Sequence, residues 1–147
     1  MIPEDVPPGP LLVDTDVISY WVVGAPAAAE FEALTIGREL AISFATYGEE
    51  LLAVGHRARW GDRRMEDLRD RIRGFVVLPY SAGVAEIWAR MHAKLSGHLH
   101  RGGTNDLWTA ACAAAITPRL PVVTNNLKDF QTIAAAFPDL RLVHPDL

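Results

Sequence analysis

Hydrophobic and polar residues fall into alternating blocks along the chain. Short apolar runs of three to five residues, typical of buried strands, are each followed by a longer stretch with apolar residues at helical spacing. The apolar runs predict strands at residues 11–13, 40–43, 75–78, 122–124 and 140–143. Strands that alternate with helices predict a parallel sheet of about five strands with helices on both faces, an α/β fold built as a three-layer α/β/α sandwich.

The helical patterns occupy the intervals between these strands. Helices are predicted at residues 30–38, 46–59, 62–73, 84–95 and 106–116, with a short one before the last strand. Residues 1–10 contain four prolines and are predicted to form an extended N-terminal segment without chemistry. Residues 11–147 show no internal repeat or linker, and their length suits one domain.

Composition narrows the class of protein. Hydrophobic residues make up 50% and charged residues 22%, a globular balance that excludes a disordered chain. The longest charge-free stretch, 17–29, is too short and too interrupted to span a bilayer, so no membrane partner is expected. The N-terminus lacks the basic start of a secretion signal. The single cysteine, Cys112, allows no disulfide within the chain, so a cytoplasmic location is expected.

Charge is unevenly distributed along the chain. A net charge of −4 argues against non-specific coating of nucleic acid. Seven of the twelve arginines nevertheless lie between residues 56 and 73, together with four acidic residues. This pattern fits a solvated pair of helices, or a surface that contacts RNA or a protein partner. The candidates for such contacts are Arg57, Arg59, Arg63 and Arg64.

Carboxylates and amides cluster just after predicted strands, where ligands bind in parallel α/β sheets. Four segments are involved: Asp14-Thr15-Asp16, Thr46 to Glu50, Asn105-Asp106 at a helix start, and Thr124-Asn125-Asn126 with Asp129 shortly after. Gathered carboxylates repel one another, and burying them is costly unless a cation is present. Oxygen ligands without cysteine or histidine partners favour Mg²⁺ or Mn²⁺ over zinc.

Each of these residues also has a purely local interpretation. Asp14 fits the N-cap of a helix, and so does Asp106. Thr46 and Glu49 have the spacing of a capping box, in which the glutamate bonds back to the threonine amide. Asp129 fits a solvated turn residue. Their joint placement after successive strands is what favours a shared site.

Four motifs in the order LLVDTDVIS, ISFATYGEELL, NDLWTAACA and VVTNNLKDF resemble the PIN-domain nucleases, and most closely the VapC-type toxins of type II toxin–antitoxin systems. The resemblance covers about residues 11–143. It implies a PIN-like three-layer fold and Mg²⁺- or Mn²⁺-dependent endoribonuclease activity, with tRNA or rRNA as expected substrates. It also implies a cognate VapB-like antitoxin and a homodimer, since toxins of this type are commonly dimers.

By motif position, the resemblance implies that Asp14, Glu49 and Asp106 are the catalytic, metal-binding acids and that Asn126 occupies a fourth metal position. The implied reaction is metal-assisted hydrolysis of a phosphodiester, with one carboxylate orienting the attacking water. Helical phase does not separate Glu49 from its neighbour Glu50. The family pattern selects Glu49.

The chain departs from the family pattern at two positions. Asp16 stands where asparagine is usual, and Asn126 stands where a carboxylate is common. The two changes roughly conserve the charge of the site, but leave open whether Asp16, Asn126 or Asp129 completes it. Thr15 is expected to orient the site by hydrogen bonding, and Thr124 is a further candidate.

Two other functions fit parts of the same pattern. Asp14-Thr15-Asp16 after an apolar strand, with Thr124 ending a later one, also resembles a haloacid-dehalogenase-like phosphatase in which Asp14 is the nucleophile. No paired acidic motif follows Thr124 on a further strand, which argues against that family. The third candidate is a PIN-like binding module without activity, for which Asn126 is the one hint.

Overall fold

The computed structural model describes residues 1–147, except for the side chain of Glu50. Its centre is one parallel sheet with the strand order β3-β2-β1-β4-β5. Leu12 on the central strand pairs with Ala41 on one side and Val122 on the other. The strands are β1 (Leu11–Val13), β2 (Leu40–Ser43), β3 (Val76–Leu78), β4 (Val122–Val123) and β5 (Leu142–Val143). The predicted five-stranded parallel sheet is confirmed.

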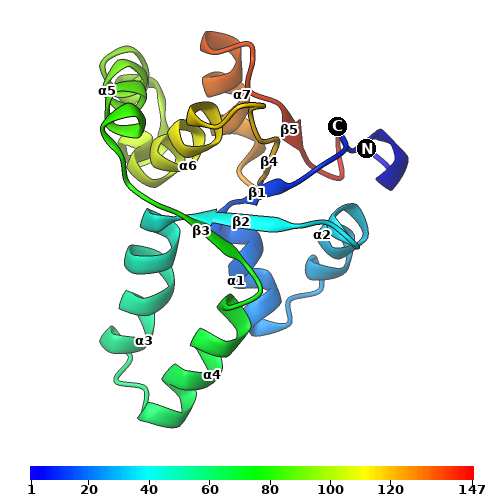
Figure 1. The fold of residues 1–147 in the computed structure, drawn as a ribbon, viewed down its shortest axis with the longest axis vertical. Helices are drawn as coiled ribbons and strands as arrows, with labels where there is room; N and C mark the ends of the chain where they lie inside the picture. The colour runs from blue at the N-terminus through cyan, green and yellow to red at the C-terminus, as the bar shows by residue number, and fades with distance from the viewer.

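Helices cover both faces of the sheet (Figure 1). One face carries α1 (Thr15–Val23), α2 (Ala28–Thr35), α3 (Ala53–Arg57) and α4 (Asp62–Ile72), and the other carries α5 (Ala82–Leu95), α6 (Thr104–Ala115) and α7 (Leu127–Ala136). Shorter helical turns are η1 (Pro3–Asp5), η2 (Thr46–Leu52), η3 (Ser96–His98) and η4 (His100–Gly103). Among the described residues, no helix is both long and apolar enough to cross a membrane.

The central strand shows why the sheet forms here. Leu11 and Val13 point into the core with α1 and α2, whereas Leu12 points into the core with α5, α6 and α7. All three are fully buried, because helices cover both faces. The sequence of a strand that is buried on both faces is a continuous apolar run, without the alternation of apolar and polar residues seen in half-buried strands. This explains why the run ends abruptly at Asp14, where the chain reaches the carboxyl edge of the sheet.

The helix expected over residues 46–59 differs from the prediction. The chain becomes helical at Phe44, directly after β2, and residues Thr46–Leu52 form a π-helix before α3 begins. In a π-helix each amide bonds five residues back instead of four, and such stretches are rare and frequent at functional sites. Glu49 lies within this segment, so its direction does not follow α-helical phase.

The N-terminal segment packs against the domain. Val6 is 5% exposed and belongs to the core beside α2. The Arg38 guanidinium donates hydrogen bonds to the carbonyl oxygens of Val6 and Pro7, at 3.0 and 2.7 Å. The N-terminal amine donates to the carbonyl of Pro145, and the two ends of the chain lie side by side in Figure 1.

Candidate functional site

Asp14 is the first residue after β1 and the N-cap of α1, so the predicted capping role is confirmed. Its side chain is almost fully buried. One carboxylate oxygen accepts a hydrogen bond from the Thr15 amide at 2.8 Å, and the other accepts one from the Thr124 hydroxyl at 3.0 Å. Two neighbouring strands, β1 and β4, therefore fix both oxygens at the centre of the carboxyl edge.

The Asp14 carboxyl group is buried and lies near other negative charges, which raises its pKa. Burial and, after it, the negative charges of Asp106 and Asp16 together raise the pKa of Asp14 from 3.8 to about 7. The hydrogen bonds from Thr15 and Thr124 lower this pKa, but only in part. Desolvation also raises the pKa of Asp16. The fold thus gathers more negative charge than it compensates, and a bound cation would relieve this.

Asn126, just before α7, connects two acidic side chains. Its Nδ2 donates to Asp106 Oδ2 at 2.9 Å and to Asp129 Oδ2 at 3.1 Å. Asp129 is buried and also accepts a hydrogen bond from the His100 amide at 3.2 Å, so its interpretation as a solvated turn residue was wrong. The N-cap interpretation of Asp106 was also wrong, because α6 begins at Thr104.

A chain of short polar side chains lies behind these acids. The hydroxyls of Thr15 and Thr46 are 2.9 Å apart, Asn105 Nδ2 donates to Thr15 Oγ1 at 2.8 Å, and Ser43 Oγ donates to Thr46 Oγ1 at 3.2 Å. Thr46 therefore ties η2 to α1, and the capping box proposed for it is absent: no side chain caps η2. Sequence reasoning missed Ser43, and it placed Asn105 in the cluster without giving it a role. The position of Ser43 at the end of a predicted strand was the available signal.

Glu49 differs from the buried acids in its exposure to solvent. Its side chain is exposed on η2. Among the described residues, no three histidine, cysteine, aspartate or glutamate side chains are placed to hold one metal ion. The structure thus brings Asp14 close to Asp106 and Asp16, without Glu49. The side chain of Glu50, the alternative to Glu49, lies outside the described residues.

The donor set at this edge fits a hard cation. Asp14, Asp16 and Asp106 supply carboxylate oxygens, and neither thiol nor imidazole is among them. In addition, Asn105 Oδ1 is buried without a hydrogen-bond partner in the part of the chain that the structure describes. A buried acceptor of this kind calls for a donor such as metal-bound water. Oxygen donors of this type suit Mg²⁺ or Mn²⁺.

Comparison with known families decides what this arrangement is. The family model of the PIN domain matches residues 11–136, which include all four segments of the site. The chain belongs to the PIN domain family. This membership overturns the phosphatase alternative, in which Asp14 would act as a nucleophile. No curated protein matches the chain by sequence.

Solved structures share the PIN fold over nearly the whole chain. The first is VapBC2 from Rickettsia felis bound to a promoter DNA fragment, with a TM-score of 0.69 and 24% identity over 91% of this chain and 97% of that one. The second is DNA-bound VapBC from Salmonella typhimurium, with a TM-score of 0.68 and 26% identity over 92% and 98%. The third is VapBC-5 from Mycobacterium tuberculosis, with a TM-score of 0.64 and 27% identity over 93% and 99%.

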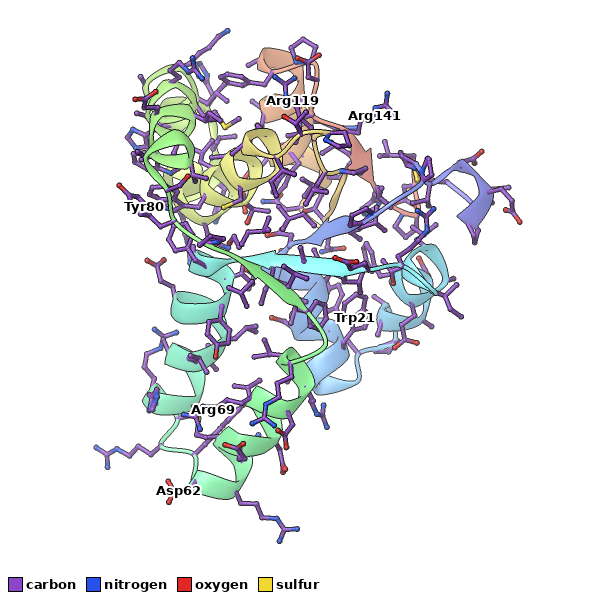
Figure 2. All side chains as sticks on the ribbon, in the orientation of Figure 1. Trp21, Asp62, Arg69, Tyr80, Arg119 and Arg141 are labelled. Carbon is purple, nitrogen blue, oxygen red and sulfur yellow. The ribbon has the colours of Figure 1, made fainter. Side chains whose placement is uncertain are left out.

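The candidate basic contacts of this PIN domain lie on another part of the molecule. Arg57, Arg59, Arg63 and Arg64 are all exposed on the α3–α4 hairpin. The Arg64 guanidinium lies 3.9 Å from the centre of the Trp60 ring, a cation–π contact. Figure 2 shows the tip of this hairpin, marked by Asp62, projecting away from the sheet. These arginines therefore form a surface separate from the buried acids.

Proposed function

We propose that this PIN domain is the VapC-type toxin of a toxin–antitoxin pair and acts as a metal-dependent endoribonuclease. The observation that supports this most strongly is the crowding around Asp14, a buried carboxylate with a pKa of about 7 beside Asp106 and Asp16. Such an arrangement costs stability in the absence of a cation. A fold that keeps it is therefore expected to bind one.

Asp14 and Asp106 are the residues we expect to hold the metal, Mg²⁺ or Mn²⁺, with Glu49 as a third ligand. When bound, the cation would offset the charge of the phosphate and make a coordinated water more acidic. Glu49 or Asp106 would orient that water by accepting a hydrogen bond. The Thr15 amide and the Thr124 hydroxyl hold Asp14 in position, because each donates a hydrogen bond to one oxygen of its carboxylate.

Asn126 is proposed as a positioning residue at the fourth site position. Because its amide donates to both Asp106 and Asp129, it fixes Asp106 without adding a negative charge. Asp16 supplies the charge that the amide lacks, since its negative charge acts on Asp14. Asp129 then supports the site from behind, through Asn126 and the His100 amide.

A VapB-like antitoxin is the expected protein partner. The structures that share this fold include the VapBC complexes from Rickettsia felis and Salmonella typhimurium, both bound to DNA. Arginine offers a bidentate fork for two carboxylates, so an inhibitory segment is expected to place an arginine or lysine at Asp14 and Asp106. The exposed arginines of the α3–α4 hairpin are available for the antitoxin or for the RNA backbone. A homodimer is the expected assembly.

Cleavage of defined RNAs by the purified protein tests this proposal. Total tRNA, rRNA and a single-stranded RNA are incubated with Mg²⁺, with Mn²⁺ or with EDTA, and the new RNA ends are sequenced. We expect discrete cuts with either metal and none with EDTA. Cleavage that is equal in EDTA would contradict the metal requirement. Absence of any cut, with intact fold and metal binding, would favour the inactive binding module.

A further inference from the structure

An unusual row of aromatic rings lies beside the candidate site. Tyr80 contacts Phe44 and Trp108 edge-to-face, with centroids 6.0 and 6.5 Å apart. Trp108 stacks on Trp88 at 4.7 Å, and Trp88 stacks on His92 at 4.6 Å. We call these five side chains the aromatic ladder. They come from four different segments, so the packing of the domain, not one local motif, assembles them.

The aromatic ladder reaches the same edge of the sheet as the acids. Phe44 directly follows β2, and Tyr80 follows β3 by two residues. Trp108 lies two residues after Asp106 on α6, so the two side chains point to opposite sides of that helix. Asp106 faces Asn126 beside β4, and Trp108 faces Phe44 beside β2. One helix therefore separates a polar half of the edge from an aromatic half.

Tyr80 is the one exposed member of the ladder among the described residues. Trp88 and Trp108 are half-buried, whereas Tyr80 is 61% exposed and marks the margin of the molecule in Figure 2. The plane of the Tyr80 ring is inclined by 88° to the Phe44 ring and by 64° to the Trp108 ring, so neither neighbour stacks on it. The ring is held by its contacts, yet it remains open to stacking by another planar group.

We propose that Tyr80 stacks on an unpaired base of the RNA, next to the phosphate whose charge a cation bound at Asp14 would offset. This proposal rests on the proposed nuclease function and names the substrate feature that the site recognises. β3 is two strands from β1 in the sheet, a separation of roughly 10 Å, which a neighbouring nucleotide can span. Stacking on an aromatic ring tolerates any base and requires the base to be unpaired.

A second copy of this chain is the competing occupant of this surface. Val76 and Val77 on the edge strand β3 are also exposed, and together with Tyr80 they would suit a subunit interface. We favour RNA because Tyr80 lies just beyond the carboxyl end of β3, at the same edge of the sheet as the acids, and contacts Trp108 on α6, the helix that carries Asp106. Val77 lies within β3, before the carboxyl end of that strand, so the exposed side chain of Val77 serves as the matched control for Tyr80.

Binding of a short RNA in the absence of cleavage tests the role of Tyr80. A fluorescently labelled single-stranded hexanucleotide is titrated in EDTA with the wild type, Tyr80→Ala, Tyr80→Phe and Val77→Ala, and its anisotropy gives Kd. We expect Tyr80→Ala to raise Kd about tenfold, while the other two variants bind like the wild type. An abasic hexanucleotide should bind the wild type and Tyr80→Ala equally.

Each other result overturns the proposal or separates it from the nuclease function. Equal Kd values for Tyr80→Ala and the wild type would overturn it, as would no binding of RNA at all. A lower molecular mass of both Tyr80→Ala and Val77→Ala by light scattering would assign the surface to a subunit interface instead. Tyr80-dependent binding without metal-dependent cleavage would support base stacking and contradict the nuclease function. Thermal melting of each variant verifies that it is folded.

Discussion

Asp14 and Glu49 are two carboxylates expected in one site, but the fold buries Asp14 and leaves Glu49 exposed. Asp14 is buried at the end of the central strand, with both oxygens hydrogen-bonded and a pKa of about 7. Glu49 is exposed on the π-helix η2. The buried half of the site is therefore assembled when the protein folds. We propose that the exposed half joins only when a cation or substrate arrives.

Electrostatics explains why the two halves are built this way. Asp14 already lies near Asp106 and Asp16, and each additional carboxylate would raise the cost of keeping it charged. An exposed Glu49 avoids that cost, because water solvates its charge. A bound cation reverses this effect, because its positive charge makes the approach of a fourth carboxylate, Glu49, favourable.

Removal of the Asp14 charge should have the largest effect on activity. Asp14→Asn keeps the shape and the hydrogen-bond acceptor for the Thr15 amide, but it loses the ligand charge. We expect kcat/KM for RNA cleavage to fall about a thousandfold, on the order of 4 kcal/mol of transition-state stabilisation. Cleavage is measured with Mg²⁺ present. Full activity of this folded variant would contradict the assignment of Asp14 to the metal site.

The role of the exposed Glu49 is tested by substituting it and its neighbour Glu50, one at a time, with glutamine. Glu49→Gln is expected to reduce cleavage about a hundredfold, or about 3 kcal/mol, with little change in thermal stability. Glu50→Gln is the matched control and should cleave RNA almost normally. If Glu50→Gln lost cleavage and Glu49→Gln did not, the family motif would be offset by one residue within η2. Glu50 would then be the metal-site acid to compare with Asp14.

The buried half should also make stability depend on pH. The pKa of Asp14 is raised from 3.8 to about 7 in the fold, so between these values the folded state binds a proton that the unfolded state lacks. The contribution of Asp14 to stability therefore falls as pH rises through this range, and its cost is complete above pH 7. Asp14→Asn should gain about 2 kcal/mol over the wild type between pH 5 and pH 8.

Urea unfolding in EDTA at these two pH values measures this difference. Asp139→Asn, a change at an exposed acid paired with Arg119, provides the control for general charge effects. A stability difference between Asp14→Asn and the wild type that did not change with pH would contradict the raised pKa. Addition of Mg²⁺ at pH 8 should remove much of the wild-type deficit, because ligand binding stabilises the folded state.

The smallest expected effect concerns Asn126. Asn126→Asp replaces an amide that donates to Asp106 and Asp129 with a third carboxylate. We expect the metal-free protein to lose about 1–2 kcal/mol of stability. We also expect the thermal shift on adding Mg²⁺ to exceed that of the wild type, as measured by differential scanning fluorimetry. A smaller shift would indicate that the amide serves the metal better than a carboxylate does.

The sequence predicted the sheet well because apolar runs are local signals. Leu11–Val13 ends at Asp14, and this abrupt change from apolar to acidic marks both the strand and the centre of the site. Asp129 could not be placed in this way, because it accepts a hydrogen bond from the amide of His100, which is 29 residues away in the chain. Thr46 was misinterpreted for the same reason: its hydroxyl meets Thr15 across two strands, which no spacing reveals.

The π-helical bonding of η2 makes this segment tolerant of changes in chain length. Each amide there bonds five residues back, and an α-helix over the same path needs fewer residues per turn. A one-residue deletion within Thr46–Leu52 is thus absorbed by a return to α-helical bonding, whereas the same deletion in β1 would invert its buried faces.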